Sequence, residues 1–304
     1  MRIVVTGGLG FIGSSFVDLC VSKGLEVLVV DKMTYASNED WLPMDTELIV
    51  SDICDVTAED LGEYEYLVNF AAESHVDNSI KDGKPFLKSN IEGTYNLLEL
   101  ARKNPKLEKF VQISTDEVYG DLDKLNIDAS FEQNFLYPSS YYSATKASAD
   151  MLVHSCGHTF GLPYVITRTC NNFGIRQHEE KFIPTIKKSI EADKPIPVYG
   201  DGKQIREWIW VEDNVKEILK LMLYKEGTYN IGSGTTLQNI DIINHIGDLI
   251  GKKPKYEFVE DRKGHDFRYA IDCEKVKKDL GWEIDTSFGE GIRNTIEWYI
   301  KKLK

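Results

Sequence analysis

The sequence of 304 residues lacks the features that mark several classes of protein. Its five cysteines are odd in number and never form a CxxC pair, which argues against a disulfide framework or a zinc site. No apolar run approaches the ~20 residues that a membrane-spanning helix needs, and the N-terminus has no signal-peptide core. We therefore predict a cytoplasmic protein with no membrane partner and no bound metal.

Basic residues are also scarce, since 36 Lys and Arg face 49 Asp and Glu for a net charge of −13. A nucleic-acid-binding protein normally carries a basic surface, so this balance disfavours a nucleic-acid partner. The protein should also repel anions at long range. A bound nucleotide would therefore depend on helix termini and a few well-placed cations.

The first half of the chain alternates short β-branched runs with helical stretches. Alternation with short connections is typical of βαβ units, which predicts an α/β fold: a Rossmann-type, doubly wound parallel sheet with helices on both faces. The predicted strands are 2–6, 26–30, 47–50, 66–70, 109–114 and 164–167. The predicted helices are 11–22, 85–104 and 140–160.

After about residue 170 the strands shorten and the helices stand apart, at 181–192, 212–224, 239–250 and 288–301. We predict a first domain over 1–170, to which segments near 207–231 return, and a smaller mixed α/β lobe over 171–304. Because no repeat or flexible linker separates the two parts, we expect a ligand between them.

A glycine-rich turn links the first predicted strand to the first predicted helix. Gly8, Gly10 and Gly13 fit the G-x-G-x-x-G pattern, and Gly7 tightens the turn further. Such a turn lets backbone amides approach a pyrophosphate at the positive end of the helix. Asp31 ends the second strand and can accept hydrogen bonds from a ribose while repelling a 2′-phosphate. These features together predict NAD as the cofactor, rather than NADP.

Tyr142 and Lys146 are four residues apart on a predicted helix, so both side chains share one face. A phenol has a pKa of ~10 and needs nearby cations to act as a base near neutral pH. An ammonium group and an oxidised nicotinamide are suitable cations. We predict that Tyr142 takes a proton from a sugar hydroxyl. Tyr199 and Lys203 show the same spacing, but they lie in a Gly-rich loop with no helix to align them.

Several stretches, spread nearly from end to end of the chain, resemble the extended short-chain dehydrogenase/reductase family, and within it the dTDP-glucose 4,6-dehydratases. The most specific is Ser114-Thr115-Asp116-Glu117, because related epimerases and decarboxylases usually lack the Asp-Glu pair. The others are 31–36, 71–77, 171–174, 180–184, 198–202, 205–208 and 264–272.

The resemblance implies an NAD-dependent hydro-lyase that converts a nucleoside-diphosphate hexose, dTDP-glucose or UDP-glucose, to the 4-keto-6-deoxy sugar. It implies that Glu117 is the base at C5, that Asp116 protonates the departing O6 hydroxyl, and that Thr115 hydrogen-bonds O4. Two adjacent carboxyl groups can serve as acid and base if their surroundings separate their pKa values. The resemblance also implies a homodimer formed through the helices at 85–104 and 140–160.

The binding residues fall into two groups. Those predicted for the cofactor are Gly7, Gly10, Phe11, Ile12, Gly13, Asp31, Lys32, Thr34, Asp52, Ile53, Ala71, Tyr142 and Lys146. Those predicted for the substrate are Asn172, Glu180, Lys181, Tyr199, Arg206 and Asn230, in the mainly substrate-binding lobe. Arg206 is expected to bind the diphosphate, because a guanidinium can do so bidentately.

Two other readings remain open at this stage. One is a C4 epimerase of the same family, which needs Tyr142 and NAD but no acid–base pair. The other is a redox-inert NAD-binding regulator that kept the fold. Tyr141, Phe173 and the segment 175–179 depart from the family pattern. The base (dTDP, UDP, GDP or CDP) and the exact hexose, N-acetylated or not, therefore stay undetermined.

Overall fold

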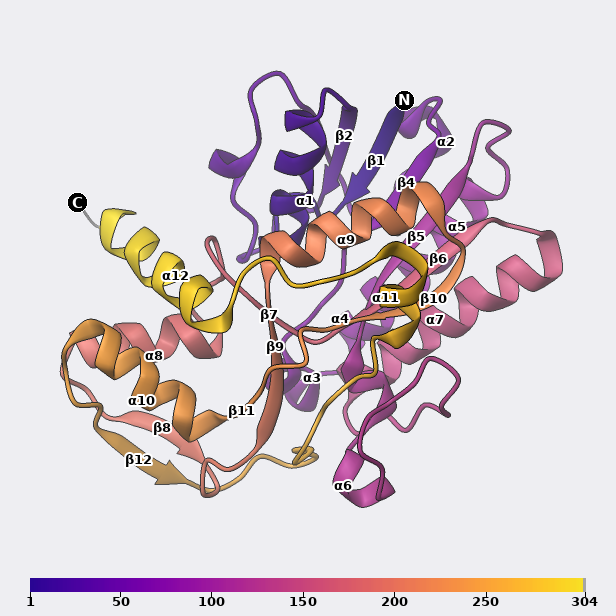
Figure 1. The fold of residues 1–304 in the computed structure, drawn as a ribbon. Helices are drawn as coiled ribbons and strands as arrows, with labels where there is room; N and C mark the ends of the chain where they lie inside the picture. Colours follow the sequence, from indigo (N-terminus) through magenta and orange to yellow (C-terminus); the bar gives the residue numbers. More distant parts are fainter. Residues whose placement is uncertain (303–304) are drawn as a thin grey trace.

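The computed structural model describes residues 1–302 (Figure 1). A large sheet covered by helices makes up the first lobe, and a smaller second lobe packs beside it. This sheet has seven strands in the order β10-β6-β5-β4-β1-β2-β3, and every neighbouring pair is parallel. Its strands are β1 (Arg2–Thr6), β2 (Glu26–Asp31), β3 (Glu47–Val50), β4 (Tyr66–Asn69), β5 (Lys109–Thr115), β6 (Tyr164–Thr169) and β10 (Gly227–Ile231). The predicted doubly wound fold is confirmed.

Burial on both faces explains why these strands are continuous apolar runs. In β1, Ile3 and Val5 face one core, whereas Val4 faces the other. The first core lies under α1 (Phe11–Ser22) and α9 (Val211–Tyr224), which pack against each other. The second core lies under α5 (Thr94–Ala101) and α7 (Tyr141–Phe160) on the opposite face.

The second lobe has its own apolar core, built largely from isoleucines and tryptophans of small sheets and three helices. One sheet has the order β11-β9-β7, and the other pairs β8 with β12 in parallel. The strands are β7 (Asn171–Phe173), β8 (Ile196–Tyr199), β9 (Ile205–Trp210), β11 (Thr236–Gln238) and β12 (Tyr256–Val259). The helices are α8 (Phe182–Glu191), α10 (Asn239–Ile250) and α12 (Phe288–Lys302).

The predicted helix over 85–104 is interrupted. The structure has α4 (Lys84–Phe86), a π-helical stretch η2 (Leu87–Gly93) and then α5, which ends at Ala101. Tertiary contacts hold the π-helical stretch, because the Asn90 amide donates to the Glu73 carbonyl oxygen and the Thr145 hydroxyl. Sequence periodicity carries no sign of these contacts.

Shorter elements were not predicted at all. They are η1 (Glu39–Trp41), α2 (Ala58–Leu61), α3 (Val76–Lys81), η3 (Asp116–Tyr119), α6 (Leu122–Leu125), α11 (Glu274–Leu280) and the strands from β7 to β12. Of the segments near 207–231, α9 and β10 lie in the layers of the large sheet, whereas β9 belongs to the three-stranded sheet. None of the helices within residues 1–302 has the length and apolar character to cross a bilayer.

Candidate active site

A cleft of about 610 Å³ lies where the carboxyl ends of the parallel strands face the second lobe. This is the edge at which open α/β sheets bind their ligands. Residues of both lobes line it. The predicted residues among them are Gly7, Gly10, Phe11, Ile12, Gly13, Asp31, Lys32, Thr34, Ile53, Ala71, Thr115, Asp116, Glu117, Tyr142, Lys146, Asn172, Glu180, Lys181, Tyr199 and Arg206.

In the glycine turn at one end of the cleft, Gly7 and Gly13 have no room for a side chain. Gly7 has a φ of +69°, and a Cβ there would lie 2.6 Å from the Ala71 nitrogen. A Cβ on Gly13 would lie 2.2 Å from the Gly7 carbonyl oxygen. Helix α1 follows with Gly10 as its N-cap and, within the described chain, no side chain capping its first turn. The first amides of helix α1 have no side-chain acceptor and can therefore donate to a pyrophosphate.

Asp31 is held at the rim of the same cleft. Its Oδ2 accepts a hydrogen bond from the Leu9 amide at 3.1 Å. Its Oδ1 accepts from the Met33 amide and the Ser37 hydroxyl, both at 2.8 Å. The amides at the uncapped start of α1 can donate to a pyrophosphate, and the fixed Asp31 carboxylate can accept from a ribose hydroxyl. A dinucleotide without a 2′-phosphate requires both kinds of group. These residues therefore fit NAD.

Asp52 lies differently from its prediction. Its neighbours Ser51 and Ile53 line the cleft, but Asp52 is absent from the described residues that do so. Its carboxylate instead accepts from the Cys54 amide at 3.0 Å and pairs with Lys88 at 3.4 Å.

The predicted catalytic pair, Tyr142 and Lys146, lies in the first two turns of α7. Ser140 caps this helix through a capping box with Ser143, so Tyr142 occupies a fixed first turn. Lys146 is buried, and its ammonium donates to the Ile113 carbonyl oxygen at 2.5 Å. Burial lowers the pKa of Lys146 to about 8, and Asp150 opposes this shift.

Burial raises the pKa of Tyr142 above that of a free phenol, and the carboxyl groups of Glu117 and Asp116 raise it further, whereas a contact with the Thr115 hydroxyl lowers it. The protein alone therefore keeps this phenol protonated. A further cation in the cleft must lower its pKa before the phenol can act as a base, and an oxidised nicotinamide supplies such a charge.

The Asp116–Glu117 pair begins η3, directly after β5. Thr115 caps this turn, because its hydroxyl accepts from the Glu117 amide at 3.3 Å and donates to Asp116 Oδ1 at 3.2 Å. Asp116 is 2% exposed, and its Oδ2 has no hydrogen-bond partner among residues 1–302. Burial raises the pKa of Asp116 well above its usual range, and the charges of Glu117 and Glu207 add to this effect.

Glu117 lies beside different charges from those beside Asp116. Burial raises its pKa too, but Arg262 and Arg206 both lower it. Burial thus raises the pKa of both carboxyls. That of Asp116 is raised well above its usual range, whereas the two arginines limit the increase at Glu117. This difference in pKa is the arrangement that an acid and a base acting on one substrate need.

Arg206 is largely committed to the protein. It donates to the carbonyl oxygens of Ile205 and Asp266, each at 2.8 Å, and of Phe267 at 3.2 Å. Its guanidinium also lies over the Tyr269 ring at 4.5 Å. Three of its five N–H groups are used in this way, so two remain for an anion in the cleft.

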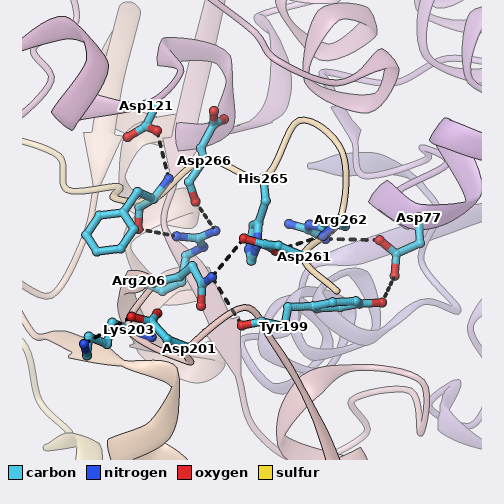
Figure 2. Close-up of polar contacts among 12 residues, drawn as sticks. Asp77, Asp121, Tyr199, Asp201, Lys203, Arg206, Asp261, Arg262, His265 and Asp266 are labelled. Atoms are coloured by element: carbon cyan, nitrogen blue, oxygen red, sulfur yellow. Dashed lines mark hydrogen bonds and ion pairs between the residues drawn. The ribbon is translucent and has the colours of Figure 1, made fainter. Parts of the chain in front are cut away.

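Arg262 is a cleft residue that the sequence analysis missed. It pairs with Asp77 at 3.3 Å, and Tyr199 donates to the other oxygen of the same carboxylate at 3.3 Å (Figure 2). The Arg262 Nε is buried and, within the described residues, has no partner. The available signal was its place in Asp261-Arg262-Lys263, directly before the recognised stretch that starts at Gly264.

His265 is held as a neutral side chain beside these groups. Its Nδ1 lies 2.6 Å from Asp261 Oδ1, and its ring meets Tyr199 edge-on. Burial and the charge of Arg262 lower the pKa of His265 to about 4.

The segment with Glu180 and Lys181 is tied to the first lobe. Glu180 accepts from the Tyr35 hydroxyl at 3.1 Å, and Lys181 donates to the Ser74 carbonyl oxygen at 3.4 Å. Asn172 lines the cleft, but its amide nitrogen donates to the Thr169 hydroxyl at 3.2 Å. These contacts place the proposed sugar ligands against the cofactor side of the cleft.

Asn230 lies outside the cleft, so its prediction as a substrate ligand needs correction. The side chain is fully buried on β10. Its Oδ1 accepts from the Tyr119 hydroxyl at 2.7 Å, and its Nδ2 donates to the carbonyl oxygens of Ser130 and Asp272 at 2.9 and 3.0 Å. Every polar group of this amide already has a partner.

Comparison with known proteins adds three kinds of match. The family model of GDP-mannose 4,6 dehydratase matches residues 4–295. The low-salt glycan biosynthesis protein Agl12 of Haloferax volcanii is 44% identical over 99% of each chain. The dTDP-glucose 4,6-dehydratase of Haemophilus influenzae is 40% identical over 99% of this chain and 98% of its own.

Solved structures match equally well along the chain. DesIV, a dTDP-glucose 4,6-dehydratase from Streptomyces venezuelae solved with NAD and TYD bound, superposes with a TM-score of 0.95 at 37% identity, covering 99% of this chain and 97% of its own. The UDP-glucose 4-epimerase of Thermus thermophilus in complex with NAD gives 0.93 at 27% identity over 99% of each chain. The fold is therefore shared by dehydratases and epimerases.

Proposed function

The chain belongs to the GDP-mannose 4,6 dehydratase family, and from this premise we propose that it is an NAD-dependent nucleotide-sugar 4,6-dehydratase. One observation carries the choice within the family. The redox pair Tyr142–Lys146 and the acid–base pair Asp116–Glu117 line one cleft. A C4 epimerase needs only the first pair, and a redox-inert regulator needs neither.

The reaction begins at C4 of the hexose. NAD, held at the glycine turn and Asp31, supplies a hydride acceptor for C4 and later a hydride donor for C6. Tyr142, as a phenolate that the buried Lys146 ammonium stabilises, takes the proton of the 4-hydroxyl through its Oη and becomes a neutral phenol. The Thr115 hydroxyl hydrogen-bonds O4 and keeps it in line with the phenol.

Elimination follows because a C4 ketone acidifies the proton on C5. Glu117, which the arginines favour as an anion, removes this proton. Asp116, which burial keeps protonated, gives its proton to O6, and the hydroxyl leaves as water. The hydride removed from C4 would then return to C6 while Glu117 returns its proton to C5, and the 4-keto-6-deoxy sugar remains. Arg206 and Arg262 are the cations that would bind the diphosphate.

The substrate test is direct. Purified protein is incubated with dTDP-glucose, UDP-glucose and the corresponding GDP and CDP sugars, and the products are read by NMR. We expect a 4-keto-6-deoxyhexose from dTDP-glucose or UDP-glucose. Unchanged sugar, or sugar inverted only at C4, across the whole panel would refute the proposal.

Glu117→Gln separates the dehydratase from the epimerase. Without the C5 base, dehydration should fall by at least about a hundred-fold. Reduction of bound NAD should continue, so the nicotinamide absorbance should rise and persist. Glu257→Gln, an exposed change on β12, is the control and should behave as wild type. An epimerase would be little affected by either change.

The assembly and compartment are also part of the proposal. Leu87, Tyr95, Met151 and Phe160 expose 49 to 59% of their surface on the predicted dimer helices. The exposure of these apolar groups supports a homodimer in which a second copy would bury them, and light scattering should give twice the chain mass. All five cysteines are free thiols, which suits a reducing cytoplasm.

A further inference from the structure

Arg168, a buried cation on β6, contacts the two elements that carry the predicted catalytic pairs, α7 and η3, without lining the cleft itself. Arg168 is 3% exposed, and its Nε donates to Asp150 Oδ2 at 2.9 Å. Its Nη1 donates to the Tyr119 hydroxyl at 3.0 Å. Asp150 lies on α7, one helical turn beyond Lys146. Tyr119 is the last residue of η3, the turn that begins with Asp116.

The Tyr119 end of this bridge is fixed on several sides. The Arg168 guanidinium lies over its ring at 4.9 Å, and its hydroxyl donates to Asn230 Oδ1 at 2.7 Å. The next residue, Gly120, has a φ of +81°, and a Cβ there would lie 2.2 Å from the Tyr137 carbonyl oxygen. The turn therefore has little freedom to shift along the sheet.

The Asp150 end is equally confined. Asp150 is fully buried, and its Oδ1 has no hydrogen-bond partner within the described chain. Asp150 also favours the charged form of Lys146 against the effect of burial. A buried ion pair contributes little net stability compared with apolar packing. Net stability therefore does not explain why the Arg168–Asp150 ion pair is buried at this position.

The reaction supplies a reason, because one bound sugar must meet both catalytic pairs in succession. A displacement of about 1 Å at a reacting group can slow a step by about a hundred-fold. The Tyr142–Lys146 pair is set by α7, whereas the Asp116–Glu117 pair is set by η3. Arg168 is a side chain that contacts both elements.

We propose that Arg168 and Tyr119 are positioning residues for the dehydration half of the reaction, holding the Asp116–Glu117 turn in register with the Tyr142–Lys146 helix. This inference rests on the proposed function. Neither residue lines the cleft among the residues described, so both act through others. Tyr119 anchors the turn, and Arg168 sets its place relative to α7.

Tyr119→Phe tests this with the smallest change, since only the bridging hydroxyl is removed. Formation of reduced nicotinamide should stay within about two-fold of wild type, whereas release of the 4-keto-6-deoxy product should slow about ten-fold. The steady-state fraction of reduced nicotinamide should therefore rise. The pH dependence of nicotinamide reduction should not move, because Tyr142 and Lys146 are untouched.

Tyr229→Phe is the matched control. Tyr229 is also buried, lies on the adjacent strand β10, and donates from its hydroxyl to Asp279 at 2.8 Å. This contact touches neither η3 nor α7. Tyr229→Phe should lose about as much stability as Tyr119→Phe. Its rates of nicotinamide reduction and of dehydration should keep the wild-type ratio.

Arg168→Lys provides an independent measurement. A lysine keeps the cation beside Asp150 but cannot span both partners, so dehydration should slow at least as much as in the Tyr119→Phe protein. The double variant should slow dehydration by much less than the product of the two single effects, because both changes break the Arg168–Tyr119 contact.

Two results would overturn the inference. One is a Tyr119→Phe protein that divides its turnover between the half-reactions as wild type does. The other is an equal fall in both half-reactions that parallels lost thermal stability, which marks a purely structural contact. A wild-type protein that makes no 4-keto-6-deoxy sugar would instead refute the proposed function.

Discussion

Asp116 and Glu117 are neighbours in the chain, but their carboxyl groups meet different surroundings. Asp116 is enclosed and faces the negative charges of Glu117 and Glu207. Glu117 faces Arg262 and Arg206. An enclosed carboxyl is costly to ionise, and a protonated carboxyl at this position is what the proposed reaction needs as its acid.

Asp116→Asn should therefore stabilise the protein while removing its activity. An unfolded Asp has a pKa of ~3.9, and the folded-state pKa of Asp116 lies well above this value. The folded state then binds the extra proton, and stability falls as the pH rises from about 4 towards the folded-state pKa. The amide does not titrate, so we expect a melting temperature about 2–4 °C above wild type near pH 8.

Thermal unfolding of the NAD-free protein between about pH 5 and pH 8 measures this effect. The advantage of the variant should shrink towards the acid end of this range. Asp128→Asn, an exposed change, is the control and should shift neither curve. A variant less stable than wild type near pH 8 would show that Asp116 is stabilised as an anion.

At the scale of single elements, the start of α7 connects helix capping to chemistry. Ser140 accepts from the Ser143 amide at 3.1 Å, and Ser143 Oγ accepts from the Ser140 amide at 3.1 Å. Tyr142 lies within this first turn. Helix α2 has the same kind of capping box, formed by Thr57 and Asp60, but it contributes no residue to the cleft.

Ser140→Ala should thus lower both stability and turnover. Loss of either cap costs about 1 kcal/mol. In α7 the frayed turn carries the catalytic phenol, so kcat should fall several-fold, whereas Thr57→Ala should lose comparable stability and keep its kcat. Unfolding and steady-state kinetics on both variants check this, and equal kcat values would contradict it.

At the scale of the whole molecule, side chains of the two lobes contact each other across the cleft. A substrate that binds there would have to fit between them. Asp77, on α3 of the first lobe, binds Arg262 and Tyr199 of the second (Figure 2). A nucleoside diphosphate has to compete with this carboxylate for the Arg262 cation. The net charge of −13 adds a general repulsion of anions.

Asp77→Asn should therefore bind nucleoside diphosphates more tightly. The amide oxygen can still accept from Tyr199, but the competing charge is gone. We expect Kd for dTDP or UDP to fall by about three- to ten-fold in calorimetric titrations. Asp201→Asn, which removes an exposed partner of Lys203 on the same lobe, should leave Kd unchanged. Weaker binding in the Asp77 variant would mean that Asp77 orients Arg262 for the ligand.

How well each element could be predicted depends on whether residues near it or far from it in the sequence determine its structure. Strands β1 to β6 and helix α1 were predicted closely, because burial on both faces or one face of a regular element leaves a repeating apolar pattern. Strands β8, β11 and β12 are short and partly exposed, so they leave no such pattern. The interruption of the 85–104 helix depends on Asn90 contacts with residues far away in the chain.

The candidate site divides in the same way. The glycine turn and the Tyr142–Lys146 spacing are local, and the structure places them in one cleft. Asn230 also follows the pattern of a polar residue in a strand that ends at the cleft edge. Its amide, however, is taken up by Tyr119, Ser130 and Asp272. Arg262 lies in a loop without periodicity and is held by Asp77, 185 residues away.

The sequence by itself predicted the parallel sheet and the NAD-type turn and placed Tyr142, Lys146, Asp116 and Glu117 in the proposed site, because each prediction depends on residue type and short spacing. Only the tertiary structure decided how the surroundings of the two carboxyls differ, that Arg262 joins Arg206 at the cleft, and that Arg168 connects α7 with η3. These properties arise from burial and from charges brought together across long stretches of chain. No local pattern encodes the electric field at a site that the whole fold encloses.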